Sequence, residues 1–408
     1  MKFTRGRYTQ GQVADLLFET ENWITEYALR NSMKVEDPVM KKDMQARIMD
    51  ASLGRNEVIF DANNRPSIYV VYRPDEKAQM AWLSNGGALF SYSDHVHPAF
   101  VVDDNVIEFL VGKYQAVRVA GVNYACSLRG LEPAHTISFD SAMTLAQAKG
   151  PGHHVMTQAE WAYLTLLAMR EGYQPRGNDN YGKSYQDGTE RAEPSYVYMS
   201  GTTRYIGSTK TGAGPLSWYL DGGPLSPADM RGNVYEWLTG YRINAGEIQV
   251  LKDNNAANFN NSQAAASALW KAIIEDGSLV DPETADTLKW DYETPPPAGG
   301  TAGFMLNTQI EIPAPDSNAY GVKTFSSLVA KGGVTVPNLL KHLLIMPCAS
   351  APLGTRYMRN LGERFGYAGG LWGSASDAGL GYLRSGYTRT NTTYGVGFRP
   401  AFYRTLRA

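Results

Sequence analysis

The sequence predicts an α+β fold in which a small N-terminal α/β module precedes a larger domain rich in short strands. Residues 8–53 carry apolar side chains at spacings near three and four, as helices do. Residues 57–74 have strand-forming side chains around a turn, and from about residue 91 the chain is rich in Tyr, Trp, Gly and turn residues. We therefore expect two domains, residues 1–90 and 91–408.

Composition narrows the function classes. The 408 residues are 43% hydrophobic and 19% charged, and the formal net charge of −2 argues against nucleic-acid binding by phosphate neutralisation. No apolar run reaches the ~18 residues that a membrane span needs, and the N-terminus lacks the apolar stretch of a signal peptide. We expect synthesis in the cytoplasm, no nucleic-acid partner and no membrane span.

The N-terminal module should hold two helices and a strand pair. The first helix has its apolar positions at Val13, Leu16, Leu17, Trp23, Ile24 and Tyr27, and a second is expected over residues 38–53. The segment EVIFDANNRPSIYVVYRP (57–74) predicts two strands around an Asp-Ala-Asn-Asn turn. The apolar helix faces pack either internally or against another subunit, so a homo-oligomer stays open.

In the second domain, TQAEWAYLTLLAMREG predicts a helix that begins after Thr157. Glu160 follows the Thr157 N-cap by three residues, as in a capping box, and Gly172 is the expected stop. Residues 260–274 (NNSQAAASALWKAII) predict another helix inside a polar insertion at about 243–302. Residues 293–303 are a linker or surface loop by their Pro and Gly content.

Residues 369–400 have the most unusual composition. Between Gly369 and Gly395 there is no Lys, Glu, Gln or Met, whereas Gly, Ser, Thr, Tyr, Asn and Asp dominate. Antibody-like binding surfaces use the same residues, because Tyr offers rigid contact area and Ser, Gly and Asn offer adaptable hydrogen bonds. The alternative is a Gly-rich loop that closes a domain.

Two further motifs suggest a buried ion pair. In RGNVYEWLTGYR (231–242), alternation along a strand would point Glu236 inward, where a carboxylate needs a partner. A metal ion, backbone amides and an arginine are all open as partners. Arg399 in GVGFRPAF (395–402) is the natural candidate, since its guanidinium can pair with a carboxylate through two hydrogen bonds.

Several segments together resemble proteins with the formylglycine-generating-enzyme type of C-type lectin fold. They are residues 153–169, 175–185, 229–237, 244–257 and the closing GVGFRP, in the family's order. Within that group the chain is most similar to variable proteins of diversity-generating retroelements and to related phage tail or receptor-binding proteins. The resemblance covers residues 91–408 and is weaker over 57–74.

The resemblance implies a variable region at 369–400 held by a fixed framework. In such systems the mutated adenines yield Ser, Thr, Gly, Asp, Tyr, Arg or Leu but never Lys, Glu, Gln, Met or Trp. The diversified positions would be Leu371, Gly373, Ser374, Ser376, Asp377, Tyr382, Arg384, Gly386, Tyr387, Asn391, Tyr394 and Gly395. The framework would be Gly369, Gly370, Trp372, Ala378, Gly379, Leu380, Leu383, Arg389, Val396, Gly397, Phe398 and Arg399.

Catalysis does not follow from the resemblance. Formylglycine-generating enzymes use two closely spaced cysteines with copper, whereas Cys126 and Cys348 are far apart in sequence and are expected to be buried. Iron-dependent relatives use three histidines. The histidines include HVH at 95–97 and HH at 153–154, but we expect them to be structural. Calcium near Asn233, Val234 and Glu236 is a weak alternative, because these residues supply oxygen ligands.

We therefore expect ligand recognition without catalysis or a cofactor. The expected contact residues are Leu371, Trp372, Gly373, Ser374, Ser376, Asp377, Tyr382, Arg384, Gly386, Tyr387, Asn391 and Tyr394, with Trp372 and the three tyrosines as anchors. The partner would be a host-cell or bacterial surface protein or a glycan, and the protein would lie on a virion tail or a bacterial surface. The alternatives are a formylglycine-generating-type oxidase and a structural virion component.

Overall fold

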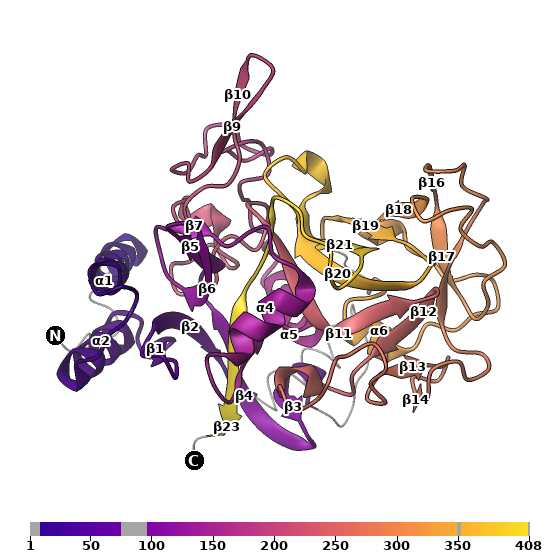
Figure 1. The fold of residues 1–408 in the computed structure, drawn as a ribbon, viewed down its shortest axis with the longest axis horizontal. Helices are drawn as coiled ribbons and strands as arrows, with labels where there is room; N and C mark the ends of the chain where they lie inside the picture. Colours follow the sequence, from indigo (N-terminus) through magenta and orange to yellow (C-terminus); the bar gives the residue numbers. More distant parts are fainter. Residues whose placement is uncertain (1–8, 75–95, 349–351, 407–408) are drawn as a thin grey trace.

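The computed structural model describes residues 9–74, 96–348 and 352–406, and it has the predicted α+β class (Figure 1). The helices are α1 (Gln10–Arg30), α2 (Pro38–Ala51), α4 (Phe139–Gln147), α5 (Gln158–Arg170) and α6 (Asn338–His342), with 3-10 turns η1 (Pro98–Phe100), η2 (Leu216–Trp218), η3 (Asn255–Ala257), η4 (Phe325–Ser327) and η5 (Ala375–Asp377). The strands belong to four sheets.

A 6-stranded sheet contains strands from both the N-terminal and the C-terminal part of the chain. The strand order is β1-β2-β4-β23-β8, with β3 beside β4. Its strands are β1 (Asn56–Phe60), β2 (Pro66–Tyr72), β3 (Val101–Val102), β4 (Asn105–Gly112), β8 (His153–Val155) and β23 (Pro400–Thr405). β2 pairs directly with β4, and β4 with β23. The expected boundary near residue 90 therefore does not separate two sheets, since the predicted 57–74 strands extend the sheet of the second part.

Helices α1 and α2 cover this end of the molecule. Thr9 caps α1 through a capping box with Gln12, as a helix start requires. The buried face of α1 includes Leu17 and Ile24, which join the core cluster around Tyr114. This apolar helix face thus packs internally, the first of the two alternatives that the sequence left open.

A 12-stranded sheet forms the other half, in the order β14-β13-β12-β11-β20-β21-β19-β18-β16, with β22 beside β11 and β15 and β17 off this path. The strands nearest the variable region are β11 (Tyr235–Asn244), β18 (Tyr320–Thr324), β19 (Thr355–Met358), β20 (Glu363–Gly369), β21 (Gly379–Tyr387) and β22 (Val396–Phe398). The outer strands are β12 (Glu247–Val250), β13 (Lys271–Ile273), β14 (Leu279–Val280), β15 (Lys289–Tyr292), β16 (Thr301–Ala302) and β17 (Phe304–Asn307).

Two smaller sheets complete the fold. One is 3-stranded and comprises β5 (Ala116–Val119), β6 (Val122–Ser127) and β7 (Glu132–Pro133). The other is the hairpin of β9 (Val197–Ser200) and β10 (Thr203–Ile206), which projects from the body (Figure 1). In the described residues, no helix combines the length and the apolar character needed to cross a membrane.

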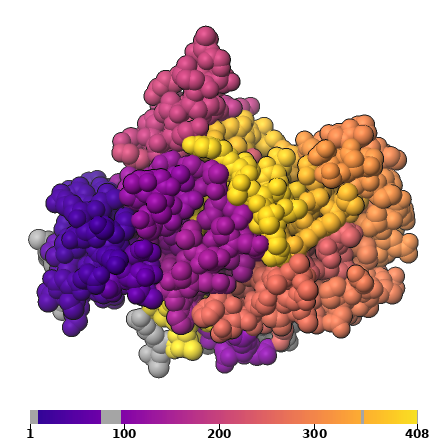
Figure 2. All heavy atoms as spheres, viewed as in Figure 1, coloured from indigo at the N-terminus to yellow at the C-terminus, as the bar shows by residue number. Residues whose placement is uncertain are grey.

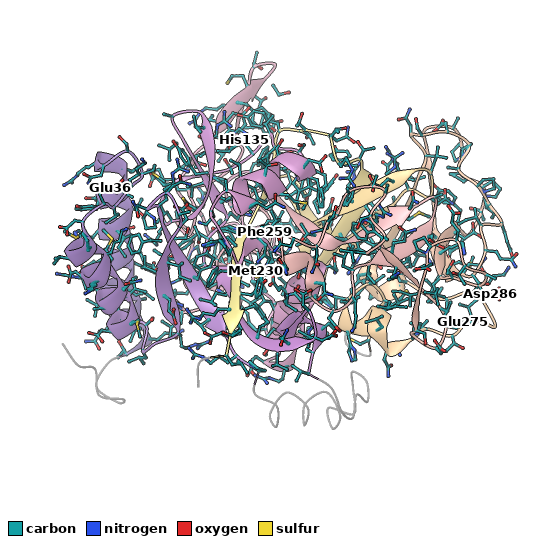
Figure 3. The ribbon with its side chains drawn as sticks, turned by 60° about the horizontal axis from the view of Figure 1, so that its bottom comes forward. Glu36, His135, Met230, Phe259, Glu275 and Asp286 are labelled. Carbon is teal, nitrogen blue, oxygen red and sulfur yellow. The ribbon has the colours of Figure 1, made fainter. Side chains whose placement is uncertain are left out.

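Helix α5 begins and ends as predicted, and it lies in the core. The Thr157 side chain accepts from the backbone of Glu160, and the Glu160 side chain accepts from the backbone of Thr157. Gly172 takes a positive φ of 66° just after the helix, where a residue without a Cβ is favoured. Figure 3 shows Met230 in the middle of the molecule, in the same buried cluster as α5, whereas Glu275 and Asp286 lie at its edge.

The prediction of a helix over residues 260–274 is wrong. This segment is a succession of turns that ends in β13. Side chains of this segment form hydrogen bonds that stabilise the turns. Gln263 accepts from the amide of Gly240, and the Trp270 indole donates to the carbonyl of Ala264. The Asn and Ser residues at its start also favour local side-chain bonds over a helical backbone.

Candidate ligand-binding surface

The backbone of residues 369–395 is held by two of the motifs that carried the resemblance, 229–237 and 175–185. The amide of Gly232 donates to the carbonyl of Gly369 (3.1 Å), the amide of Trp372 to that of Asn233 (3.2 Å), and the amide of Tyr235 to that of Gly395 (2.8 Å). Residues 232–235 thus bind both ends of the loop and strand segment 369–395. Backbone bonds of this kind contribute roughly 1 kcal/mol each.

The segment 175–185 supports the same loop from the other side. The amide of Tyr181 donates to the carbonyl of Trp372 (2.6 Å), and the amide of Ala375 to that of Asp179 (2.8 Å). Asp179 is held in turn by the buried Arg231 side chain (2.6 Å). The loop therefore rests on buried, charge-paired structure, which fixes its position.

The predicted ion pair between Glu236 and Arg399 is confirmed. Arg399 Nε lies 2.8 Å from Glu236 Oε2 and Nη2 lies 2.7 Å from Oε1, and both side chains are buried. The remaining guanidinium hydrogens bond the carbonyls of Gly112, Lys113 and Ala228. A buried pair is tolerated when its polar atoms are satisfied in this way.

The oxygens of Asn233, Val234 and Glu236, which were considered as calcium ligands, all accept hydrogen bonds from protein groups. The amide of Gln115 donates to the Val234 carbonyl and to Glu236 Oε1 (3.0 Å each), and Arg399 takes both Glu236 oxygens. Asn233 Oδ1 accepts from the amide of Thr209 (2.8 Å), and its Nδ2 donates to Gln115 Oε1 (2.9 Å). These residues form a polar network inside the fold that supports the clamp at 232–235.

One face of the large sheet gathers tyrosines and arginines from neighbouring strands. Arg384 lies opposite Tyr367 on β20 and opposite Tyr357 on β19, so the three side chains share a face. A β-bulge near Gly386 shifts the register so that Tyr387 lies opposite Phe365, on this face as well. We name the set the Tyr/Arg face: Tyr235, Tyr320, Tyr357, Arg359, Tyr367, Tyr382, Arg384 and Tyr387.

The rings of the Tyr/Arg face form a continuous network. Tyr382 stacks on Tyr235 with centroids 5.4 Å apart and an interplanar angle of 18°, and it lies 5.7 Å from Tyr357. Tyr387 lies 5.1 Å from Tyr367. Tyr235, Tyr357 and Tyr387 are half-buried, so part of each ring reaches the surface. In Figure 2 the yellow C-terminal residues are visible between the earlier segments on either side.

Not all of the predicted diversified positions face solvent. Tyr382 is 2% exposed, because it is covered by Tyr235 and Tyr357. Gly395 has a φ of 94°, and a Cβ there would lie 2.4 Å from Leu371 Cδ1, so this position belongs with the framework. Gly386 is buried, yet a Cβ would meet nothing closer than Arg359 Nε at 3.9 Å.

The loop positions of the predicted set differ in exposure. Gly373, Ser376, Asn391 and Tyr394 are exposed, whereas Leu371, Ser374, Asp377, Arg384 and Tyr387 are half-buried and Trp372 is buried. Ser374 and Asn391 use their side chains to bond the amides of Leu371 and Thr388. Their roles in binding stay predictions.

The ring of Tyr394 belongs to a second group of tyrosine rings, which extends onto the projecting hairpin. Its ring lies 4.4 Å from that of Tyr196, and the series continues through Tyr198 (5.7 Å) and Tyr205 (5.5 Å) to Tyr181 (5.0 Å). We name these five residues the hairpin ladder. His135 lies at the base of the hairpin (Figure 3), 4.5 Å from Tyr394. The ladder therefore ties the hairpin to the variable loop.

Residues outside the predicted set also belong to this surface. Tyr320, Tyr357 and Arg359 lie on β18 and around β19, outside the 369–400 segment, and only the strand pairing places them beside Arg384. The hairpin ladder had a readable signal, since the tyrosines at 196, 198 and 205 flank the Ser-Gly turn of YVYMSGTTRYIG.

Tyr357, Tyr367 and Tyr382 keep neutral hydroxyls. Burial raises the pKa of Tyr367 and Tyr382, and burial together with the charge of Asp377 raises that of Tyr357. Asp377 accepts from Tyr357 (3.0 Å) and from Thr355 (2.7 Å). The hydroxyls can therefore donate hydrogen bonds at neutral pH.

The cysteines and the described histidines lie within the fold, where other protein groups contact them. Cys126 is buried and Cys348 half-buried, and the two form no disulfide. His154 bonds Glu160 (2.8 Å), and His97 bonds the carbonyl of His342 (3.0 Å). His95 lies outside the described residues. Among those that are described, no three His, Cys, Asp or Glu side chains are grouped to hold a metal ion.

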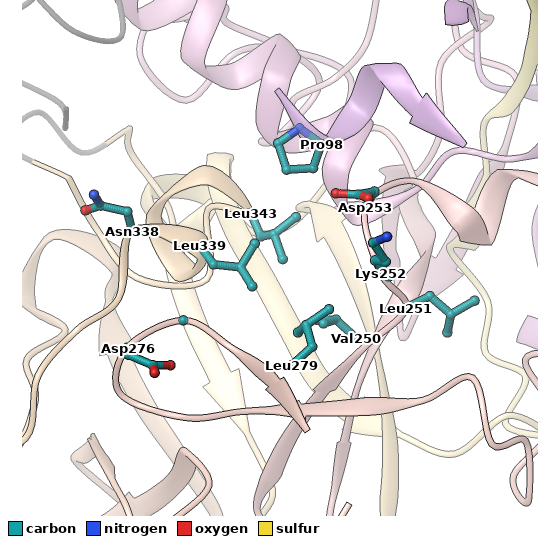
Figure 4. A pocket seen from close by; sticks show the side chains of 11 residues that line it. Pro98, Val250, Leu251, Lys252, Asp253, Asp276, Leu279, Asn338, Leu339 and Leu343 are labelled. Carbon is teal, nitrogen blue, oxygen red and sulfur yellow. The ribbon is translucent and has the colours of Figure 1, made fainter. Parts of the chain in front are cut away.

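Cavities also lie away from the Tyr/Arg face. One, of about 420 Å³, has an aliphatic base of Val250, Leu279, Leu339 and Leu343 and a polar rim that includes Lys252 and Asp276 (Figure 4). Another, of about 760 Å³, lies between α1, the end of α5 and the 220–226 loop. Neither contains a residue of the predicted site.

Comparisons with known proteins give weak structural likenesses. No protein-family model and no curated protein matches the chain. Among solved structures, Treponema denticola variable protein 1 aligns over 85% of this chain and 98% of its own, with 11% identity and a TM-score of 0.32. The U1 and I1 variants of the Major Tropism Determinant align over 85% and 86% of this chain, with 9% and 10% identity and a TM-score of 0.28 each.

This chain aligns with only part of each tropism determinant. The alignments cover 66% and 62% of those chains. Similarity at these TM-scores does not establish a shared fold.

Proposed function

We propose that this chain is a non-catalytic recognition protein, with a C-type lectin-like arrangement over residues 91–408 and a diversified C-terminal surface. It binds a surface protein or glycan of a host cell or bacterium, from a virion tail or a bacterial surface. The observation that carries the proposal is the Tyr/Arg face: half-buried Tyr and Arg from β18, β19 and β21 meet on one side of a sheet. Such residues dominate the energetics of protein recognition.

The construction of the loop fits recognition by interchangeable side chains. Its backbone is fixed by bonds from Gly232, Trp372 and Tyr235, none of which depends on the identity of a variable side chain. An exposed position such as Ser376 can then change without altering the support. Pre-organised loops bind with less loss of conformational entropy.

The surroundings of Cys126 support a non-catalytic role. Burial raises the pKa of its thiol, so the protonated form dominates at neutral pH. A copper-binding or nucleophilic cysteine needs the thiolate, which a lowered pKa favours. We assign no calcium ion to Glu236, because Arg399 and Gln115 already satisfy its oxygens.

Binding of the labelled, purified chain to a panel of intact bacterial and animal cells tests the proposal. The double variant Tyr320→Ala/Tyr387→Ala should lose binding to any cell type that the natural protein binds. Tyr403→Ala is the matched control, because Tyr403 is a half-buried tyrosine in the other sheet. Equal binding by all three proteins would contradict recognition through this face.

Neighbouring DNA tests the diversification separately. A reverse-transcriptase gene and a near-copy of the stretch encoding residues 369–400, differing at adenines, are the expected finding. Adenine-poor codons at Arg384, Tyr387 and Tyr394, without such a copy, would contradict diversification and leave recognition to the cell-binding test.

A further inference from the structure

We infer that Arg359 and Arg384 form the charged centre of the Tyr/Arg face and receive a carboxylate side chain from a protein partner. This inference rests on the proposed function and names the chemistry of what the face binds. It concerns two arginines from different strands, one of which, Arg359, lies outside the 369–400 segment.

The two guanidinium groups converge on one ring. Arg384 lies over the Tyr320 ring, 5.6 Å from its centroid, and Arg359 lies over it at 5.9 Å. Arg384 is also 5.0 Å from the Tyr357 ring. Stacking on aromatic faces holds a guanidinium in place while leaving its N–H groups available to a ligand.

Neither arginine has a carboxylate within ion-pair distance in the described parts of the chain. The nearby acids are engaged: Asp377 accepts from Thr355 and Tyr357, and Asp316 accepts from the amides of Asn318 and Ala319. By contrast, Arg389, which is one of the predicted framework residues, pairs with Glu363 and Asp140. Within the described residues Arg359 and Arg384 thus form no ion pair, and their N–H groups can pair with an anion from outside the chain.

The charge of Arg359 acts on acidic and basic neighbours alike. Hydrogen bonds from the amides of Asn318 and Ala319, and then the charge of Arg359, lower the pKa of the Asp316 carboxyl. Burial, and then the charge of Arg359, lowers the pKa of the Arg364 guanidinium. A carboxylate can accept two parallel N–H bonds from one guanidinium, which are stronger than bonds between neutral groups.

The shape of the face favours a protein over a sugar. Between Tyr320, Tyr357, Arg359, Arg384 and Tyr387 there is a notch of only about 10 Å³, room for one water-sized group and not for a sugar ring. Around it the half-buried tyrosines form a broad surface, the arrangement in which Tyr and Arg act as hot spots between proteins. An Asp or Glu side chain on a protein surface fits this combination.

Immobilised poly-L-glutamate, poly-D-galacturonate and neutral dextran test the inference by biolayer interferometry at physiological salt. The intact chain should bind polyglutamate at least about tenfold more tightly than Arg359→Gln/Arg384→Gln, since charge-assisted bonds are lost. Arg30→Gln/Arg47→Gln removes the same charge from the exposed faces of α1 and α2 and should bind like the natural chain. Equal affinity of the two double variants would overturn the inference.

The polygalacturonate arm separates the sources of the carboxylate. Stronger, arginine-dependent binding to polygalacturonate than to polyglutamate would overturn a protein partner in favour of an acidic glycan. Dextran should not bind.

The cell panel separates this inference from the proposed function. If Tyr320→Ala/Tyr387→Ala loses cell binding while Arg359→Gln/Arg384→Gln keeps it, recognition stands and the carboxylate inference fails. If both double variants bind cells like the natural chain, the proposed function fails at this face.

Discussion

Arg399 and Glu236 lie 163 residues apart and form a buried ion pair through two hydrogen bonds, 2.7 and 2.8 Å long. Glu236 lies on β11 beside β22, and Arg399 directly follows β22. The pair therefore joins the last strands of the chain to the strand whose start clamps the variable loop. Its loss should be felt both in stability and in the position of that loop.

A double-mutant cycle with Glu236→Gln and Arg399→Gln measures this pair. Each single variant should lose about 3–5 kcal/mol of unfolding free energy, because it leaves one buried charge without its partner. The double variant should lose clearly less than the sum of the two. Additive losses in urea-induced unfolding would show that the two side chains do not act as a pair.

Tyr382→Ala should destabilise the fold by about 3 kcal/mol, because it removes a buried ring from between Tyr235 and Tyr357. Tyr394→Ala, at a position that is 44% exposed, should change stability by less than about 1 kcal/mol. Thermal or chemical unfolding separates the two. Equal, small losses would mean that Tyr382 is not part of the core.

Glycine positions within 369–395 should tolerate substitution unequally. Gly395→Ser should be strongly destabilising, because a Cβ would approach Leu371 at 2.4 Å and Trp372 at 2.9 Å in a backbone with positive φ. Gly386→Ser should be nearly neutral, since nothing lies within 3.9 Å of its Cβ. If melting temperatures of the two variants agree, the division into framework and variable positions is wrong.

Acid should unfold the protein through its buried histidines. Burial lowers the pKa of His97 to about 4 and those of His153 and His342 to about 2. Because the unfolded chain takes up these protons near pH 6.5, stability falls as the pH drops below that value, by about 1.4 kcal/mol per pH unit for each histidine. Asp229 opposes this in part, since burial raises its pKa to about 6.

Urea unfolding at pH 7.5, 6.5 and 5.5 measures the effect. His153→Gln should reduce the slope below pH 6.5, because it removes one of the histidines whose pKa is lowered by burial. A stability that is constant or rises between pH 6.5 and 5.5 would contradict the buried, neutral state of these rings.

Local signals were sufficient for part of the structure. The capping box of Thr157 and Glu160 predicted where α5 begins, and the turn at 61–64 predicted the pairing of β1 with β2. The partner of Glu236 was also predictable, because a buried carboxylate needs a cation and Arg399 stood in a strand-like apolar context. In the first two cases the deciding chemistry lies within a few residues of the motif, and in the third the charge and the strand-like context of each residue were sufficient.

Long-range pairing decided the rest. The continuity of β2 with β4 and β23, and the meeting of Tyr320 and Tyr357 with Arg384, depend on strand register between distant segments. The same register puts Tyr382 on the face with Arg384, where Tyr235 and Tyr357 cover its ring, and a bulge keeps Tyr387 on that face as well. Composition identified 369–400 as unusual, but it could not separate the exposed members of that segment from the buried ones.

The central claim is that a fixed framework presents exchangeable side chains, and one variant tests it most directly. Arg384→Ser, Tyr387→Asp, Asn391→Asp and Tyr394→Ser would be combined in one chain, and both its melting temperature and its binding to the cell panel would be measured. The account predicts a melting temperature within ~4 °C of the natural protein together with loss of cell binding. A large fall in melting temperature, or binding that is unchanged, would contradict it.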